Sequence, residues 1–94
     1  MKKTCSEDGW RRFLTLCSAS SPKELEELFD LFFTLEEKEA VGKRYLILKA
    51  LLDRKLTQRE IAKVAHVSIS KITRGSNALK VISSKMKEAL QRDM

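Results

Sequence analysis

The chain has 94 residues, the size of a single domain, which we place at 1–94. Its 19 Lys and Arg outweigh 13 Asp and Glu, and the excess is uneven: residues 1–42 carry a net charge of −3 and residues 43–94 a net charge of +9. The basic half predicts a polyanionic partner, nucleic acid before anionic lipid, whereas no apolar run approaches the roughly 18 residues that a membrane span needs.

The two cysteines, Cys5 and Cys17, lack the spacing of a metal site or a redox pair, and no cleavable apolar leader precedes them. We therefore expect a cytoplasmic protein without metal. A chain this short buries only roughly 60–65% of its unfolded surface, so a second copy that shares its core is expected as well.

Scarce Gly and Pro, and abundant Leu, Lys, Glu and Ala, predict helices throughout. In chain order, helix starts are expected at Ser6, at Ser21 with Pro22 and Glu24, and at Thr34 with Glu37, which opens the longest helix. The apolar side chains that follow recur at helical spacing. They are Trp10, Phe13, Leu14 and Cys17, then Leu25, Leu28, Phe29 and Phe32, and then Val41, Tyr45, Leu48 and Leu52, which we expect to be buried.

The first three helices are apolar over much of their circumference, with Leu31 and Phe33 widening the stripe of the second. One neighbouring helix cannot cover so wide a surface, which favours a partner subunit over a monomeric core with exposed Phe. A last helix is expected from Ser83 or Ser84, with Met86 and Leu90 at i and i+4. The expected fold is all-α, with six helices in the chain.

The segment TQREIAKVAHVSISKITR has the spacing of a helix-turn-helix, which we place at about residues 57–80. Thr57 and Glu60 form a capping box, and His66 stands in the turn, where a left-handed backbone is usual and His tolerates it better than most residues. Ser68 is expected to cap the second helix. Ile69 and Ile72 should face inward, while Ser70, Lys71 and Thr73 point outward near the end that reaches base edges.

The string ITRGSNALK follows, and with LFFTLEEKEAVGKRYLILKALL upstream it makes the chain resemble the tryptophan repressor family from about Leu31 to Lys80, and more loosely over the whole chain. The resemblance implies an intertwined homodimer whose second helices of the motif enter successive major grooves of operator DNA, a docking for which this repressor is a known example. It also implies L-tryptophan as co-repressor.

For the ligand, the resemblance implies that Arg44 and Arg74 sandwich the indole, because a flat guanidinium stacks on an aromatic face. Arg74 would also pair with the carboxylate, and Gly75 would let the indole approach the backbone. The other implied ligand-binding residues are Leu48 as the floor and Leu31, Phe33 and Thr34 for the amino and carboxylate ends. Ala78 departs from the family pattern, in which a Ser is frequent, and this removes one hydrogen bond to the ammonium group, worth roughly 0.5–1.5 kcal/mol.

For DNA, the resemblance implies that Arg59 reaches a guanine edge, with Thr57 and Gln58 on phosphate. Lys63, Lys71 and Lys80 are candidates for backbone contacts, and Ser68, Ile69, Ser70 and Thr73 complete the predicted DNA-binding surface.

Together these residues predict a tryptophan-dependent transcriptional repressor that binds operator DNA as a homodimer and needs no cofactor besides its co-repressor. The alternative is a ligand-independent helix-turn-helix protein with an architectural or replication role, or a helical module whose basic face meets acidic protein. An enzyme is not expected, since the sequence has neither paired carboxylates in a Gly-rich loop nor a nucleophile with its base.

Overall fold

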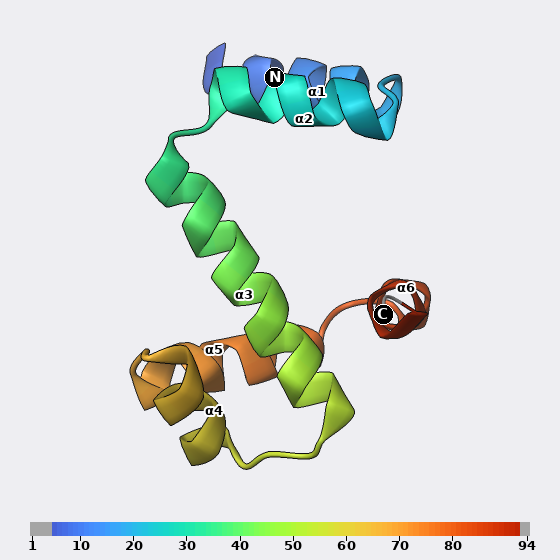
Figure 1. The fold of residues 1–94 in the computed structure, drawn as a ribbon. Coiled ribbons are helices and arrows are strands. Elements are labelled where there is room, and N and C mark those ends of the chain that lie inside the picture. The colour runs from blue at the N-terminus through green and yellow to red at the C-terminus, as the bar shows by residue number, and fades with distance from the viewer. Residues whose placement is uncertain (1–4, 93–94) are drawn as a thin grey trace. The chain divides into compact units, whose positions relative to one another are not determined.

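The structure is a computed structural model that describes residues 5–92, and within this range it contains helices and no strands (Figure 1). This confirms the all-α prediction. The helices are α1 (Cys5–Ser18), α2 (Pro22–Phe32), α3 (Leu35–Asp53), α4 (Gln58–Ala65), α5 (Ile69–Leu79) and α6 (Ser84–Arg92). None of these helices is long and apolar enough to cross a membrane. The chain divides into two compact units, at Leu35 and Glu36, and the ends of the predicted domain 1–94 lie outside the described residues.

The first unit contains α1 and α2, and α2 begins where the sequence predicts. Ser21 Oγ accepts a hydrogen bond from the Glu24 backbone N–H at 3.2 Å, and the Ser21 N–H donates to Glu24 Oε1 at 2.8 Å. The backbone bond from Ser21, followed by the bond from its side chain, lowers the pKa of Glu24 below its ordinary value. Because both partners are satisfied reciprocally, this turn is a stable start for the helix.

Aromatic side chains hold α1 against α2. The Phe13 ring lies 4.9 Å from Phe32 and 6.1 Å from Phe33, centroid to centroid, and Trp10 stacks on Phe13 at 5.7 Å. Such pairs contribute about 0.5–1.5 kcal/mol each beyond the area they bury. Even so, α1 and α2 contain no buried residue, and Trp10 stays 59% exposed.

The second unit is built around three isoleucines, one from each of three helices. Ile47 of α3, Ile61 of α4 and Ile72 of α5 form the buried cluster, and α4 and α5 lie against the C-terminal part of α3 in Figure 1. Partly buried side chains surround this cluster, namely Ala50, Leu51, Ala62, Ala65 and Val67. Burial of these side chains supplies most of the driving force that keeps the three helices together.

The predicted buried row of α3 is wrong by one position. Val41 is 54% exposed and Leu48 only partly buried, whereas Ile47, next to Leu48, is buried. Neighbouring residues on a helix differ by about 100°, so the buried cluster takes in the face of Ile47 and Leu51, while Leu48 lies at its edge, next to Gly75 of α5.

The last helix starts as predicted, since Ser83 Oγ accepts a hydrogen bond from the Met86 backbone N–H at 3.1 Å. Lys49 Nζ of α3 donates to the Leu90 carbonyl of α6 at 2.8 Å. A cation on a carbonyl of the last turn is a favourable helix end, because the helix dipole is negative there.

Candidate functional site

The helix-turn-helix consists of α4 and α5, joined by a turn that His66 makes possible. His66 adopts left-handed angles, φ 56° and ψ 45°, and ends α4, with its N–H directed to the carbonyls of Ala62 and Lys63. The Val67 N–H donates to the Ala62 carbonyl at 3.1 Å, which completes the turn. The turn role predicted for His66 is therefore confirmed.

The first helix of the motif also begins with a capping box. Thr57 Oγ1 accepts from the Glu60 N–H at 3.1 Å, and the Thr57 N–H donates to Glu60 Oε1 at 2.9 Å. The backbone bond from Thr57, and after it the side-chain bond, lowers the pKa of Glu60. Ile61 follows directly and is buried against Ile72, so the box fixes where α4 begins and thereby how it meets α5.

The second helix begins at Ser68 as predicted, but the Ser68 side chain makes no capping bond. Its Oγ lies 3.0 Å from Ser70 Oγ instead, so the two hydroxyls bond one another. Ile69 is also not inward-facing: it is 46% exposed, whereas Ile72 one turn later is fully buried. Ile69 is the first residue of α5 and is not part of the buried cluster of Ile47, Ile61 and Ile72.

The outer surface of the motif is polar and exposed. Thr73 Oγ1 donates to Gln58 Oε1 at 3.3 Å across the two helices, which links the residues that flank this surface. All the residues predicted to contact DNA are exposed, namely Thr57, Gln58, Arg59, Lys63, Ser68, Ile69, Ser70, Lys71, Thr73 and Lys80. Their contact with DNA stays a prediction.

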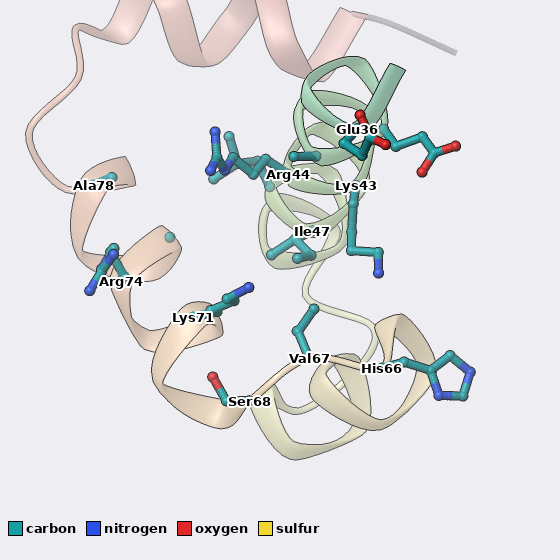
Figure 2. A pocket seen from close by; sticks show the side chains of 14 residues that line it. Glu36, Lys43, Arg44, Ile47, His66, Val67, Ser68, Lys71, Arg74 and Ala78 are labelled. Carbon is teal, nitrogen blue, oxygen red and sulfur yellow. The ribbon is translucent and has the colours of Figure 1, made fainter. Parts of the chain in front are cut away.

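A cleft of about 780 Å³ lies between α3 and α5 (Figure 2). Two helical stripes form most of its lining, because residues at i, i+3, i+4 and i+7 share one face of a helix. The α5 stripe consists of Lys71, Arg74, Gly75 and Ala78, and the α3 stripe consists of Glu36, Glu39, Ala40, Lys43, Arg44, Ile47 and Leu48. His66, Val67 and Ser68 line the end of the cleft at the turn. This volume is in the range of small-molecule sites in proteins.

The cleft is rich in positive charge. Lys43 and Arg44 of α3, and Lys71 and Arg74 of α5, outnumber its two carboxylates, Glu36 and Glu39. In the described part of the chain none of these six side chains has an ion-pair partner. An occupant with a negative group is therefore favoured by the charge of the lining.

Four of the residues predicted to bind the ligand line this cleft together. They are Arg44 and Leu48 of α3 and Arg74 and Gly75 of α5, and the two arginines are 30 residues apart in sequence. Figure 2 shows Arg44 and Arg74 on opposite sides of the opening, one from each helix. The other three, Leu31, Phe33 and Thr34, belong to the first unit, and their contact with a ligand stays a prediction.

Comparison with known proteins identifies the family. The family model described as Trp repressor protein matches residues 8–94. The chain belongs to this family. The Trp operon repressor homolog of Chlamydia trachomatis serovar D is 50% identical over 93 residues, which cover 98% of this chain and 99% of the relative. The homolog of Chlamydia caviae is 50% identical over 92 residues, which cover 97% of this chain and 91% of the relative. The homolog of Mannheimia succiniciproducens is 38% identical over 86 residues, which cover 90% of this chain and 85% of the relative.

Membership of the Trp repressor family makes the chain a Trp-repressor-like regulator. It also confirms the family that the string ITRGSNALK and the segment around Arg44 predicted. The family model also matches most of α1 and all of α2, in agreement with the looser resemblance predicted over the whole chain.

Several residues of the cleft were missed by sequence reasoning. Lys43, Glu36 and Glu39 were not assigned to a ligand, and Lys71 was assigned to DNA, although all four line the cleft. A signal for them exists in the sequence, because Glu36, Ala40, Lys43 and Ile47 are spaced as one helical face, and so are Lys71, Arg74, Gly75 and Ala78. Extending the stripe from each predicted arginine along its own helix would have found them.

Proposed function

We propose that the protein is a tryptophan-dependent transcriptional repressor that binds operator DNA as a homodimer, with L-tryptophan as co-repressor. The observation that supports this most directly is the cleft between α3 and α5, because Arg44 and Arg74 line it from different helices and α5 is also the second helix of the helix-turn-helix. One helix thus belongs to both the ligand cleft and the DNA-reading motif.

The lining suits an aromatic amino acid. Guanidinium groups are flat cations that stack on aromatic faces and pair with carboxylates through two parallel hydrogen bonds. Arg44 and Arg74 supply these planes, while Leu48 and Ile47 supply an apolar floor. Gly75 has no side chain, so α3 side chains such as Leu48 come close to the backbone of α5 there, and we propose that the indole lies against this backbone at the cleft. Because Ala78 offers only a methyl group, the ammonium end of the ligand is held less firmly than its carboxylate end.

The outer face of the motif suits duplex DNA. Residues 43–80 carry ten basic and two acidic side chains, and the exposed ones can neutralise phosphates without regard to sequence. Arg59 on α4 is exposed, and its guanidinium can read a guanine edge with about 1–3 kcal/mol of discrimination. Lys63 and Lys80, exposed on the same motif, are proposed phosphate contacts.

The apolar surface of the first unit supports the homodimer. No residue of α1 or α2 is buried, and Leu31 is 80% exposed at the end of α2. Exposed apolar area of this kind costs about 25 cal/mol per Å² relative to burial, so cover by a second copy is strongly favoured. Two copies related by a two-fold axis would also present two α5 helices to successive major grooves, about 34–36 Å apart.

The proposed mechanism is a shift between two states of the reading helices. Tryptophan between Arg44 and Arg74 fixes the position of α5 against α3, and thereby the spacing between the two copies of α5 in the dimer. By linkage, operator DNA then tightens tryptophan binding by the same factor as tryptophan tightens DNA binding.

Fluorescence anisotropy with a duplex from the region upstream of the chain's own gene tests this proposal, with a scrambled duplex as control. Tryptophan should raise the affinity for the upstream duplex and leave the scrambled one nearly unchanged. Arg59→Ala should lower the preference between the two duplexes, whereas Lys80→Ala should weaken both alike. If tryptophan changed neither affinity, a ligand-independent DNA-binding protein would replace the proposal.

A further inference from the structure

We propose that Lys71, which sequence reasoning assigns to a DNA phosphate, is a specificity-determining residue of the ligand cleft that receives the carboxylate of the bound amino acid. The inference rests on the proposed tryptophan-binding function, and it adds to the cleft a third cation beside Arg44 and Arg74.

The position of Lys71 on α5 separates it from Ile69 and Thr73, two of the residues proposed to face DNA. A helix turns by about 100° per residue, so Lys71 lies about 160–200° around α5 from Ile69 and Thr73. It shares the cleft-lining stripe with Arg74 at i+3 and Gly75 at i+4 instead. Figure 2 shows the Lys71 side chain extending from α5 toward α3, into the space beside Ile47.

The charges of the cleft explain why a carboxylate is the group that Lys71 selects. In the described part of the chain Lys71 has no ion-pair partner, and its neighbours in the lining include Lys43, Arg44 and Arg74. Glu36 and Glu39 also line the cleft and attract an ammonium group, but the four cations outnumber these two carboxylates, so the lining as a whole favours a carboxylate over an ammonium group. Ala78 adds no acceptor for an ammonium group, so discrimination falls on the carboxylate end. The ligand class is therefore an aromatic amino acid with its carboxylate free, rather than the corresponding amine.

The test compares the substitutions Lys71→Met and Lys80→Met in the full chain. Methionine keeps an unbranched apolar stem and removes the charge. Lys80 is a matched control, because it is an exposed lysine at the C-terminal end of the same helix, bonded to Asn77 Oδ1 at 3.4 Å and outside the cleft. Affinities for tryptophan and for tryptamine, which lacks the carboxylate, are measured by calorimetry. The salt dependence of ligand-free DNA binding is measured beside them.

We expect Lys71→Met to weaken tryptophan binding by roughly threefold to tenfold, the range of an exposed ion pair in a favourable geometry, and not to weaken tryptamine binding. The preference for tryptophan over tryptamine should therefore narrow. Lys71→Arg should restore it, and Lys80→Met should leave both affinities unchanged.

Unchanged tryptophan affinity in Lys71→Met, together with a salt slope of DNA binding lower by about 0.9, would overturn the inference and return Lys71 to a phosphate contact. Absence of tryptophan binding by the unsubstituted protein is a separate result that would overturn the proposed function itself. Equal urea midpoints of the two Met variants show that a change in affinity is not a loss of folding.

Discussion

Gly75→Ala separates the packing of α5 from its proposed role in ligand binding. A methyl group at Gly75 would lie 3.5 Å from Leu48 Cδ2, 3.5 Å from Leu51 Cδ1 and 3.8 Å from Ile47 Cγ2, all ordinary van der Waals distances. The substitution therefore strains nothing in the ligand-free chain. Because alanine is favoured over glycine by about 0.8–1.0 kcal/mol inside a helix, we expect the free energy of unfolding to rise by about 1 kcal/mol. That corresponds to a rise in Tm of roughly 4–8 °C for a domain of this size.

The same methyl group should harm tryptophan binding. It fills space between Gly75 and Leu48, both of which line the cleft, where the proposed indole approaches the backbone of α5. Forcing an extra methyl into a filled site costs about 1–3 kcal/mol, so affinity for tryptophan should fall by roughly fivefold or more. A variant that is more stable and binds less tightly is the expected combination.

Urea denaturation followed by circular dichroism, and calorimetry with tryptophan, measure the two effects. Gly42→Ala is the control, because a methyl there meets nothing within 4 Å and Gly42 lies outside the cleft lining. It should gain helix stability without a change in tryptophan affinity. If Gly75→Ala were destabilised by 1 kcal/mol or more, α5 would lie closer to α3 than described. If its tryptophan affinity were unchanged, the indole would not lie beside Gly75.

Three further predictions concern the fold that holds the site. Ile72→Ala should lower the free energy of unfolding by about 2–5 kcal/mol, because Ile72 is fully buried in the small core of the motif, and a loss under 1 kcal/mol in urea would contradict that core. Arg54→Gly and His66→Gly should each raise Tm and increase the free energy of unfolding by up to about 1 kcal/mol, because both residues hold φ at 56°. A lower Tm would show that the contacts of their side chains contribute more than the backbone strain costs. Glu60→Gln should make the free energy of unfolding depend less on pH under acid conditions. The lowered pKa of Glu60 contributes stability that is present above its ordinary pKa and is lost as pH falls through the folded-state pKa. An acid-unfolding curve unchanged by the substitution would refute this.

Local signals in the sequence predicted much of the fold correctly, because they depend on residues within one turn of each other. The Ser21 and Thr57 capping boxes appear as predicted, and the left-handed turn falls on His66. Each of these features depends on hydrogen bonds between residues three or four positions apart, so the residue types in a short segment are sufficient to predict it.

The rotation of each helix about its own axis was not predictable in the same way. Val41 and Leu48 belong to an apolar row as regular as that of Ile47 and Leu51, and only the docking of α4 and α5 decides which row is buried. The place of Lys71 in the cleft lining was not predictable for the same reason, since a short helix apolar at Ile69 and Ile72 allows either face to turn inward, and its predicted contact with DNA stays a prediction. Long-range packing decides which face of α3 and of α5 is turned inward, and the periodicity of apolar residues alone does not determine it.

Calorimetric titration of tryptophan into the Arg44→Leu variant tests the proposed ligand site most directly. Arg44 is exposed and lines the cleft, so its replacement should leave the urea midpoint close to that of the unsubstituted protein. We predict that the variant loses at least about tenfold in tryptophan affinity, because both a stacking plane and a positive charge are removed. A folded Arg44→Leu protein that binds tryptophan as tightly as the unsubstituted chain would contradict the placement of the ligand between α3 and α5.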